Sequence, residues 1–367
     1  MKALILILGL ITTSSLSFLG QTNAPAAEQS VRTVQAIDIS QKSKSEYKSS
    51  AEQWKTFVEA NMSDASAWLN YYKALRFESY TEHSRKISNE KQQKLDQIIT
   101  TMGANVSGSF EFEYVNYLNG NKSGAAFQHL KKAWSMRPGD RELIDDMIAM
   151  ATIENNAGEM KQYCQLLSNA DVYNAAEVEY NRNVFNSIEA NGILITSGNV
   201  DTYPLLMMQQ LQNFRNDVTV ICLEWLGNEN YQEKVKSWLG ITSGKAVTED
   251  KLFNHKTNRP VYFSLTVSPD ILKPKSADLY CTGLAMKHST GVVENIPSLV
   301  YNWESLFTKN NLHQGESINK NYLLPMLLLK NQYDVSGQTQ KAEEIKLQIE
   351  QIANRFALSQ TAKKHID

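Results

Sequence analysis

The hydrophobic pattern of this chain changes its period near residue 191, and this change limits the folds that the chain can adopt. From Glu46 to about Ala190, apolar residues recur at three- and four-residue spacings, which is typical of amphipathic helices. After Asn191 come short apolar runs rich in β-branched residues, and these alternate with helical patterns. We therefore expect a fold class of α/β plus all-α, with the helical part first.

Short segments with polar residues or glycine divide the helical part, 46–190. They predict turns between antiparallel helices, so this part reads as a chain of helical hairpins that stack into a solenoid. The predicted turns are Asn61–Asp64, Met102–Gly103, Asn119–Asn121, Arg137–Asp140 and Ala157–Gly158.

The segment 191–290 has the strand–helix–strand alternation of a βαβ unit. Because its strands are almost entirely apolar, they predict a mainly parallel sheet that is covered on both faces. The remaining residues, 291–367, are predicted as helices that end in a hairpin turning at Ser336–Gln338. The predicted strands are Gly192–Gly198, Asp217–Leu226, Val261–Val267 and Leu279–Lys287, and the first helix between them is Tyr203–Phe214.

Residues 1–24 have the features of a secretory signal peptide. Lys2 precedes a nine-residue apolar stretch that is too short to span a bilayer, and Ala24-Pro25-Ala26 forms a small-residue cleavage pattern. Cleavage before Gln21 and an uncleaved anchor are the alternatives. We expect an exported protein, periplasmic or secreted, with residues 25–45 as a loose leader and no transmembrane segment in the mature chain.

The charge balance and the sulfur and imidazole residues exclude several classes of function. With 37 Lys and Arg against 39 Asp and Glu, the chain has no cationic excess for binding nucleic acid. Three cysteines are too few for a disulfide framework; we expect buried thiols, and a Cys222–Cys281 bridge is the alternative. The six histidines show no metal-binding spacing, so we expect neither a metal nor a cofactor.

The loop after the first predicted strand is the main candidate for a ligand site. In open α/β sheets, ligands bind beyond the carboxyl ends of the strands, and Ser197, Asn199, Asp201 and Thr202 lie at that point before a helix. The alternative is a purely structural role, in which Asp201 or Thr202 caps the helix 203–214 and Pro204 occupies its first turn.

Two further candidates follow the second predicted strand. Glu224 would face Asp201 if the two strands are neighbours, and two carboxylates at one sheet edge suit acid–base chemistry or a hard cation. Trp225 would offer a stacking surface for a sugar ring. The alternatives are a solvated loop charge for Glu224 and a core position for Trp225. We find no complete catalytic set and therefore name no catalytic residue.

One stretch of the helical part resembles the tetratricopeptide repeat family. With Pro138 as the terminal proline, Phe110 and Tyr117 fall on the large aromatic positions, and Ala126 and Ala133 fall on the small ones. The sequence departs from the family at Tyr114, where the family prefers glycine.

The resemblance implies a protein- or peptide-binding region. Tyr71, Tyr72, Tyr114 and Tyr117 would line its groove; packing between repeat helices is the alternative.

The C-terminal half resembles the soluble region of bacterial membrane proteins related to protein O-mannosyltransferases. The family's first strand ends in a loop like T-N-G-D-N-D-T-F-P, and this chain matches it at Thr196, Gly198, Asp201, Thr202 and Pro204. The multi-spanning half, in which glycosyl transfer would reside, has no counterpart here. The resemblance therefore implies a shared fold rather than transferase activity.

Together these features lead to two functional expectations. The first is an exported, non-enzymatic interaction or scaffold protein with an envelope protein or peptide as its partner. The second is a glycan-binding or glycosylation accessory protein that uses the loop 197–203.

Overall fold

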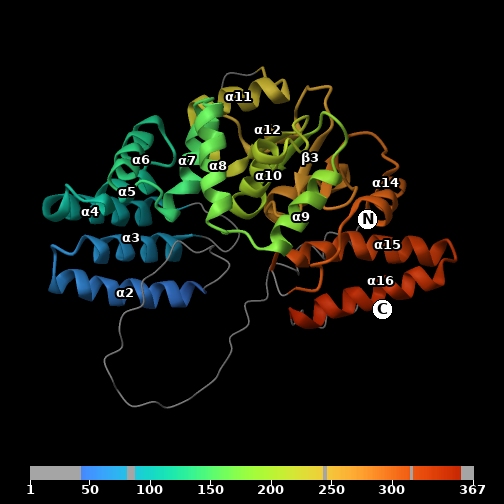
Figure 1. Cartoon of the computed structure of the whole chain (residues 1–367), viewed down its shortest axis with the longest axis horizontal. Coiled ribbons are helices and arrows are strands. Elements are labelled where there is room, and N and C mark those ends of the chain that lie inside the picture. The colour runs from blue at the N-terminus through green and yellow to red at the C-terminus, as the bar shows by residue number, and fades with distance from the viewer. Residues whose placement is uncertain (1–42, 81–86, 243–245, 315–316, 357–367) are drawn as a thin grey trace, which may run out of the picture. The chain divides into compact units, whose positions relative to one another are not determined.

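The computed structural model describes residues 43–80, 87–242, 246–314 and 317–356 (Figure 1). The predicted signal peptide, 1–24, and most of the predicted leader, 25–45, lie outside the described residues. The chain divides into two compact units, one ending at Met150 and one continuing from Ala151. The predicted bounds 46–190, 191–290 and 291–367 stay predictions, and α8 and α9 belong to the same unit as the sheet.

The first unit consists of helices joined by short turns. α2 packs against α3, α4 contacts both α3 and α5, and α5 packs against α6; Figure 1 shows α2 and α3 side by side. Side-chain caps fix where these helices begin, since Ser43, Asp64 and Ser109 each accept a backbone N–H of the first turn. The helices are α2 Lys44–Ala60, α3 Ala65–Ser79, α4 Asn89–Val106, α5 Phe110–Asn119, α6 Gly124–Met136 and α7 Arg141–Ile153.

Turns are present at three of the predicted places, near Asn61–Asp64, Asn119–Asn121 and Arg137–Asp140. The other two turn predictions are wrong. α4 continues through Gly103, which faces the ring of Phe112 at the distance of a close packing contact, 3.1 Å from a Cβ built there. Ala157–Gly158 begins α8, because the Asn156 side chain caps that helix.

The second unit contains a small mixed sheet. Among the described residues it has five strands in the order β2-β1-β3-β5-β4. β1 pairs in parallel with β2 and β3, whereas β5 is antiparallel to β3 and β4. The prediction of a mixed helical and sheet class is therefore confirmed, but the sheet is less parallel than expected. The strands are β1 Ile193–Thr196, β2 Thr219–Cys222, β3 Val261–Ser264, β4 Leu279–Cys281 and β5 Ala285–His288.

Two of the predicted strands differ from the observed ones. The run 279–287 is a hairpin and not one strand, because the chain reverses at Gly283, whose φ of 154° is rare for residues with a side chain. The run 217–226 forms only the short β2, after which Leu223–Trp225 makes a 3₁₀ turn. An apolar run in the sequence indicates that its residues are buried. Buried residues need not be in a strand, so the run alone does not predict extended backbone.

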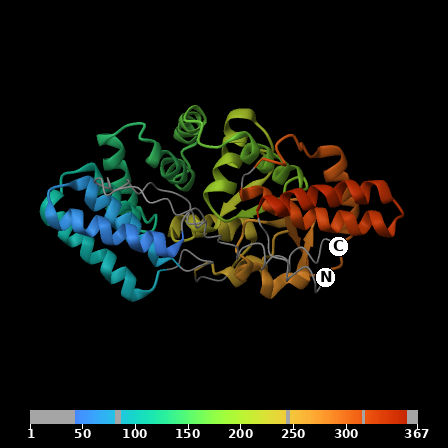
Figure 2. The same cartoon turned by 90° about the horizontal axis from the view of Figure 1, so that it is seen from below.

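Helices pack against this sheet: α14 contacts β4, and α10 contacts β2 as well as α8 and α9. α15 and α16 form the predicted antiparallel hairpin, with Ser336–Gln338 as its turn (Figure 2). None of the described helices is both long and apolar enough to cross a membrane. The helices are α8 Ala157–Asn169, α9 Ala175–Asn186, α10 Asn199–Gln212, α11 Glu229–Leu239, α12 Glu249–Phe253, α13 Pro269–Leu272, α14 Asn295–Tyr301, α15 Leu323–Val335 and α16 Thr339–Arg355.

The core of the second unit is the sheet itself, since every residue of β1 and β3 is buried. The three cysteines are buried and none of them forms a disulfide, as expected from their apolar surroundings. The alternative of a Cys222–Cys281 bridge is wrong, because β2 and β4 form opposite edges of the sheet.

Candidate functional site

The loop between β1 and α10 lies at the carboxyl ends of three neighbouring parallel strands, as predicted. Its centre is the side chain of Asp201, which has no exposed surface. The two carboxylate oxygens accept the backbone N–H groups of Ser197 and Gly198, each at 2.9 Å, and the hydroxyl of Thr266. These donors come from the loop and from the end of β3, so Asp201 fastens one to the other.

α10 begins at Asn199, four residues earlier than predicted, and this changes the roles of its first residues. Asp201 is the third residue of the helix and reaches back to the N–H of Gly198, the residue that precedes the helix. The Thr202 hydroxyl is 2.8 Å from the Thr196 hydroxyl, which also donates to the carbonyl of Ile221. Asp201 therefore does take part in capping the helix, as the structural alternative expects, but from its third residue and for a helix that begins at Asn199 rather than Tyr203.

Burial raises the pKa of the Asp201 carboxyl, while hydrogen bonds from Thr266, Gly198 and Ser197 lower it in part. Both oxygens have donors from this chain. A ligand that used Asp201 would first have to separate the loop from the end of β3.

Glu224 also lies against this loop. A Cβ built on Gly198 would be 2.2 Å from a carboxylate oxygen of Glu224, so the carboxylates of Glu224 and Asp201 both lie next to Gly198. Trp225 is 1% exposed, and its ring contacts those of Tyr203 and Tyr231 with centroids 6.0 and 5.4 Å apart. Trp225 is thus placed in the core, which was the alternative interpretation.

The six predicted ligand-site residues therefore separate into two groups. Asn199 is exposed, and Ser197 and Glu224 are partly exposed. Asp201, Thr202 and Trp225 are buried. Only the first group can meet a ligand without rearrangement of the loop.

A buried asparagine that the sequence analysis missed supports the first turns of α10. Pro204 has no N–H and cannot donate to the carbonyl four residues earlier, that of Val200. The Nδ2 group of Asn181 donates to this carbonyl at 2.9 Å, and Asn181 is fully buried. The sequence signal was Pro204 itself, because a proline inside a helix leaves an acceptor that another residue must satisfy.

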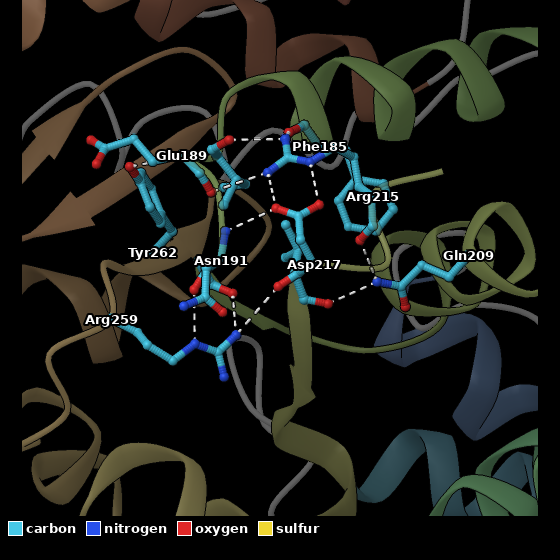
Figure 3. A network of polar contacts seen from close by, with 11 residues as sticks. Phe185, Glu189, Asn191, Gln209, Arg215, Asp217, Arg259 and Tyr262 are labelled. Carbon is cyan, nitrogen blue, oxygen red and sulfur yellow. Dashed lines mark hydrogen bonds and ion pairs between the residues drawn. The ribbon is translucent and has the colours of Figure 1, made fainter. Parts of the chain in front are cut away.

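A second polar network lies at the opposite edge of the sheet, where β1, β2 and β3 begin (Figure 3). Arg215 donates to the carbonyl oxygens of Phe185, Ile188 and Glu189, the last two at 2.9 and 3.1 Å. It also pairs with Asp217, with 2.9 Å between Nε and Oδ1. A cation is favourable here because the Phe185 carbonyl lies in the last turn of α9, and the other two carbonyls follow directly after that helix.

Arg259 extends this network to the third strand. Its guanidinium donates to the carbonyl oxygens of Asn191 and Gly192, at 2.8 and 2.9 Å, and to the hydroxyl of Thr219 at 2.8 Å. Asp217 accepts the N–H of Asn191 at 2.9 Å, and its hydrogen bonds with Arg215 lower its pKa to about 2. Most of the donors drawn in Figure 3 serve backbone carbonyls, so we interpret the network as a structural clamp.

Of the four tyrosines predicted to line a partner groove, three are buried inside the helical unit. Tyr72 donates to Asn119, and the Tyr117 hydroxyl accepts from Lys122, both at 2.9 Å. Tyr114 is 2% exposed. Only Tyr71 is partly exposed. Buried rings cannot line a surface groove. The placement of Tyr72, Tyr114 and Tyr117 therefore supports the alternative role, packing between helices.

No group of three His, Cys, Asp or Glu side chains suited to a metal ion occurs in the part of the chain that the structure describes. Two histidines that the sequence separates widely, His255 and His288, are nevertheless within hydrogen-bond distance of each other.

Comparison with known proteins gives one family match. A family model described as TMEM260-associated domain 2 matches residues 177–239, which run from the first turn of α9 to the end of α11. The match includes the loop at Asp201, the Arg215–Asp217 pair and Glu224. No curated protein and no solved structure matches the chain.

Proposed function

We propose that this chain is an exported, non-enzymatic interaction or scaffold protein of the cell envelope, and that its first, helical unit binds the partner. The packing of α2 to α6 carries the proposal, because each helix contacts the next one along the chain. Consecutively stacked helices expose a long continuous surface, which repeat proteins use to bind proteins and peptides.

The packing of α5 against α6 supports a tetratricopeptide-like assignment for this unit. A Cβ built on Gly120, which directly follows α5, would be 2.6 Å from the Cβ of Ala126 in the first turn of α6, so the small residues allow a tight turn between the two helices. Ala133 has no exposed surface. The aromatic rings of Tyr117 and Phe127 stack with centroids 6.3 Å apart and fill the space between the helices. We propose that α5–α6 is one such unit and α2–α3 a degenerate one.

The α2–α3 hairpin presents two large apolar side chains that we assign to partner contact. Phe57 is 47% exposed in the last turn of α2, and Met62 is 44% exposed in the turn that follows. Covering such side chains in a complex is favourable by about 25 cal/mol per Å² of apolar surface. We call Phe57 and Met62 the hairpin tip.

Crosslinking mass spectrometry in the native host tests this proposal. We expect reproducible crosslinks from the helical unit to one envelope protein, and we expect Phe57→Ser with Met62→Ser to reduce them. The matched control is Val335→Ser, because Val335 is also an exposed apolar side chain, 88% exposed, at the end of α15 in the other unit. Absence of any specific partner, or equal crosslinking by all three proteins, would contradict the proposal.

A glycan-binding or glycosylation accessory role is the second candidate, and the exposed side of the β1–α10 loop favours it. Asn199, Ser197 and Glu224 offer hydrogen-bonding groups at the carboxyl edge of the sheet, where α/β proteins bind ligands. The resemblance to the soluble region of membrane proteins related to O-mannosyltransferases points in the same direction. In this proposal Asp201 shapes the loop and does not contact the glycan.

Glycan-array binding with three proteins separates the two candidates. The second candidate predicts sugar binding by the unaltered chain and its loss in Asn199→Ala and Glu224→Gln, neither of which removes a buried group. If the unaltered chain binds no glycan on the array, this candidate is wrong, while the crosslinking result is unaffected.

The exported location is a proposal of its own, and it has a direct test. The N-terminal sequence of the protein from the native host, read by mass spectrometry, should begin near Gln21 or after Ala26. A protein that keeps its apolar N-terminal stretch and fractionates with the cytosol would contradict export.

A further inference from the structure

His255 and His288 form a direct imidazole–imidazole contact. His255 Nε2 is 3.0 Å from His288 Nδ1, and the two rings meet edge to face with centroids 5.1 Å apart. His288 is the last residue of β5, whereas His255 lies in the connection between α12 and β3. The contact therefore fastens this connection to the sheet.

The contact lies on an aromatic cluster. The rings of Phe253, at the end of α12, and Phe263, in β3, stack with centroids 4.5 Å apart. The His288 ring packs edge-on against both, at 5.4 and 6.4 Å. His288 is 8% exposed, so the pair is poorly solvated on this side.

The proton count of the pair decides whether the contact holds. With both rings neutral, one of the two facing nitrogens donates and the other accepts. One added proton still leaves one donor and one acceptor between the rings. A second proton puts hydrogen on both facing nitrogens, which then repel each other as two cations 3.0 Å apart.

Two charged groups face the pair, and they act on its protonation in opposite directions. Asp278 favours protonation of His288, whereas Lys275 opposes it, and both lie in the turn Lys273–Asp278. Burial lowers the pKa of both histidines, and for His255 the charge of His288 lowers it further. Because the folded-state pKa values lie below the ordinary value of about 6.5, the stability from neutral rings is present above that pH. It is lost progressively as the pH falls through the folded-state values.

The geometry points to a proton-operated latch: the neutral His255–His288 pair holds the α12–β3 connection against the sheet, and double protonation releases it. The released part is Glu249–Asn258, which includes α12 and Phe253, because Arg259 is held by Asn191 and Gly192 and the Pro260 carbonyl by the N–H of Ile193. The pair and the two phenylalanine rings come from α12, its connection to β3, β3 and β5. β1 and β2 supply none of these four rings, so we expect them to stay folded when the latch opens. The latch does not depend on the function proposed above.

Hydrogen–deuterium exchange on the full chain tests the latch. After correction for intrinsic rates, peptides from 246–258 should exchange about ten-fold faster near pH 5 than near pH 7.5. At pH 5 the released rings are almost fully protonated, because their ordinary pKa is about 6.5, whereas double protonation of the closed pair is disfavoured. Peptides containing β1 should change little. Equal acceleration of both regions would overturn the latch, because it would indicate general acid unfolding.

Two variants test whether the acid-induced acceleration of exchange requires the two histidines. His255→Gln and His288→Gln keep hydrogen-bonding groups but cannot titrate, so each should abolish the acid-induced acceleration in 246–258. His255 is only partly buried, and its variant keeps the test open if the His288 variant fails to fold. The matched control is His129→Gln, since His129 pairs with Glu113 in the other unit. Retention of the full acceleration in His255→Gln would overturn the latch.

The same exchange experiment with added Zn²⁺ distinguishes a proton latch from a metal site made by the two histidines. Zn²⁺ added near pH 7.5 should leave exchange in 246–258 unchanged. Strong protection by Zn²⁺ that disappears in His255→Gln would show that the pair binds metal, and it would overturn the proposal.

Discussion

At the scale of single residues, the loop after β1 is held by two buried side chains with opposite hydrogen-bonding roles. Asp201 accepts two backbone N–H groups and one hydroxyl, and Asn181 donates to the carbonyl that Pro204 leaves without its usual partner. Each of these side chains satisfies backbone groups that folding removes from water. A buried backbone group without a partner costs about 1–3 kcal/mol, so both positions are sensitive to substitution.

Replacing Asp201 by alanine should destabilise the fold by about 2 kcal/mol or more, because it leaves the N–H groups of Ser197 and Gly198 without their acceptor, whereas the Thr266 hydroxyl can still bond to Ser264. The control is Asn174→Ala, which also removes the acceptor of two backbone N–H groups, but at an exposed position. That change should cost about 1 kcal/mol. Urea unfolding followed by circular dichroism measures both. Equal losses of unfolding free energy in the two variants would mean that burial does not increase the contribution of Asp201 to stability.

Asn181→Ala should cost about 1–3 kcal/mol in the natural chain and clearly less in a Pro204→Ala background. In that background the backbone at position 204 regains an N–H, which can donate to the Val200 carbonyl in place of Asn181. A double-mutant cycle from thermal or urea unfolding gives the coupling directly. If Asn181→Ala costs the same with and without Pro204, the two residues do not share this carbonyl.

The sequence predicted where these residues lie but not which way they face. The strand-to-helix pattern at 192–214 correctly predicts a loop at the carboxyl edge of the sheet. The inward direction of Asp201 depends on Thr266, which the sequence separates from it widely and which only the pairing of β1 with β3 brings close. The role of Asn181 likewise depends on how α9 packs against α10.

At the scale of elements, the hairpin of β4 and β5 makes the sheet mixed, and it depends on Gly283. The residue has a φ of 154°, and a Cβ there would lie 2.4 Å from the Ser187 hydroxyl and 2.9 Å from the Phe307 ring. Apolar periodicity cannot reveal such a reversal, because both strands of the hairpin are buried and read as one apolar run. The helices were easier to predict, since their turns carry capping residues such as Ser43 and Asp64.

Gly283→Ala should destabilise the second unit by more than about 2 kcal/mol, since it adds both an unfavourable backbone conformation and a steric overlap. Gly337→Ala is the matched control: Gly337 also has positive φ, 73°, but no heavy atom lies within 4 Å of its added Cβ. Its cost should be the smaller, about 1 kcal/mol. Thermal unfolding of the two variants makes the comparison, and a larger loss at Gly337 would show that crowding at Gly283 is relieved by its neighbours.

At the scale of the whole molecule, each of the two compact units has its own buried core. Leu130 and Tyr114 are buried in the first, and Ile195 and Phe263 are buried in the second. The change of hydrophobic period showed that helix gives way to sheet, but it could not show which helices join the sheet. That depends on the contacts of α10 with α8 and α9, which lie before the change in the sequence.

We expect the two units to unfold in separate cooperative steps, because each buries its own apolar core. Leu130→Ala should reduce the free energy of unfolding of one step by about 2–5 kcal/mol, which lowers the urea midpoint of that step, and it should leave the other step unchanged. Ile195→Ala should do the reverse. Urea unfolding with exchange mass spectrometry assigns each step to its peptides. A single transition that both substitutions shift equally would contradict independent cores.

The central position of β1 has a consequence for synthesis on the ribosome. The hairpin of α2 and α3 closes with residues that emerge together, so the first helices can form as the nascent chain grows. β1 pairs with Thr219–Cys222 on one side, but its other neighbour begins only at Val261. Until that segment has been translated, one whole flank of Ile193–Thr196 stays unpaired, and a chaperone that shields apolar strands would bind there.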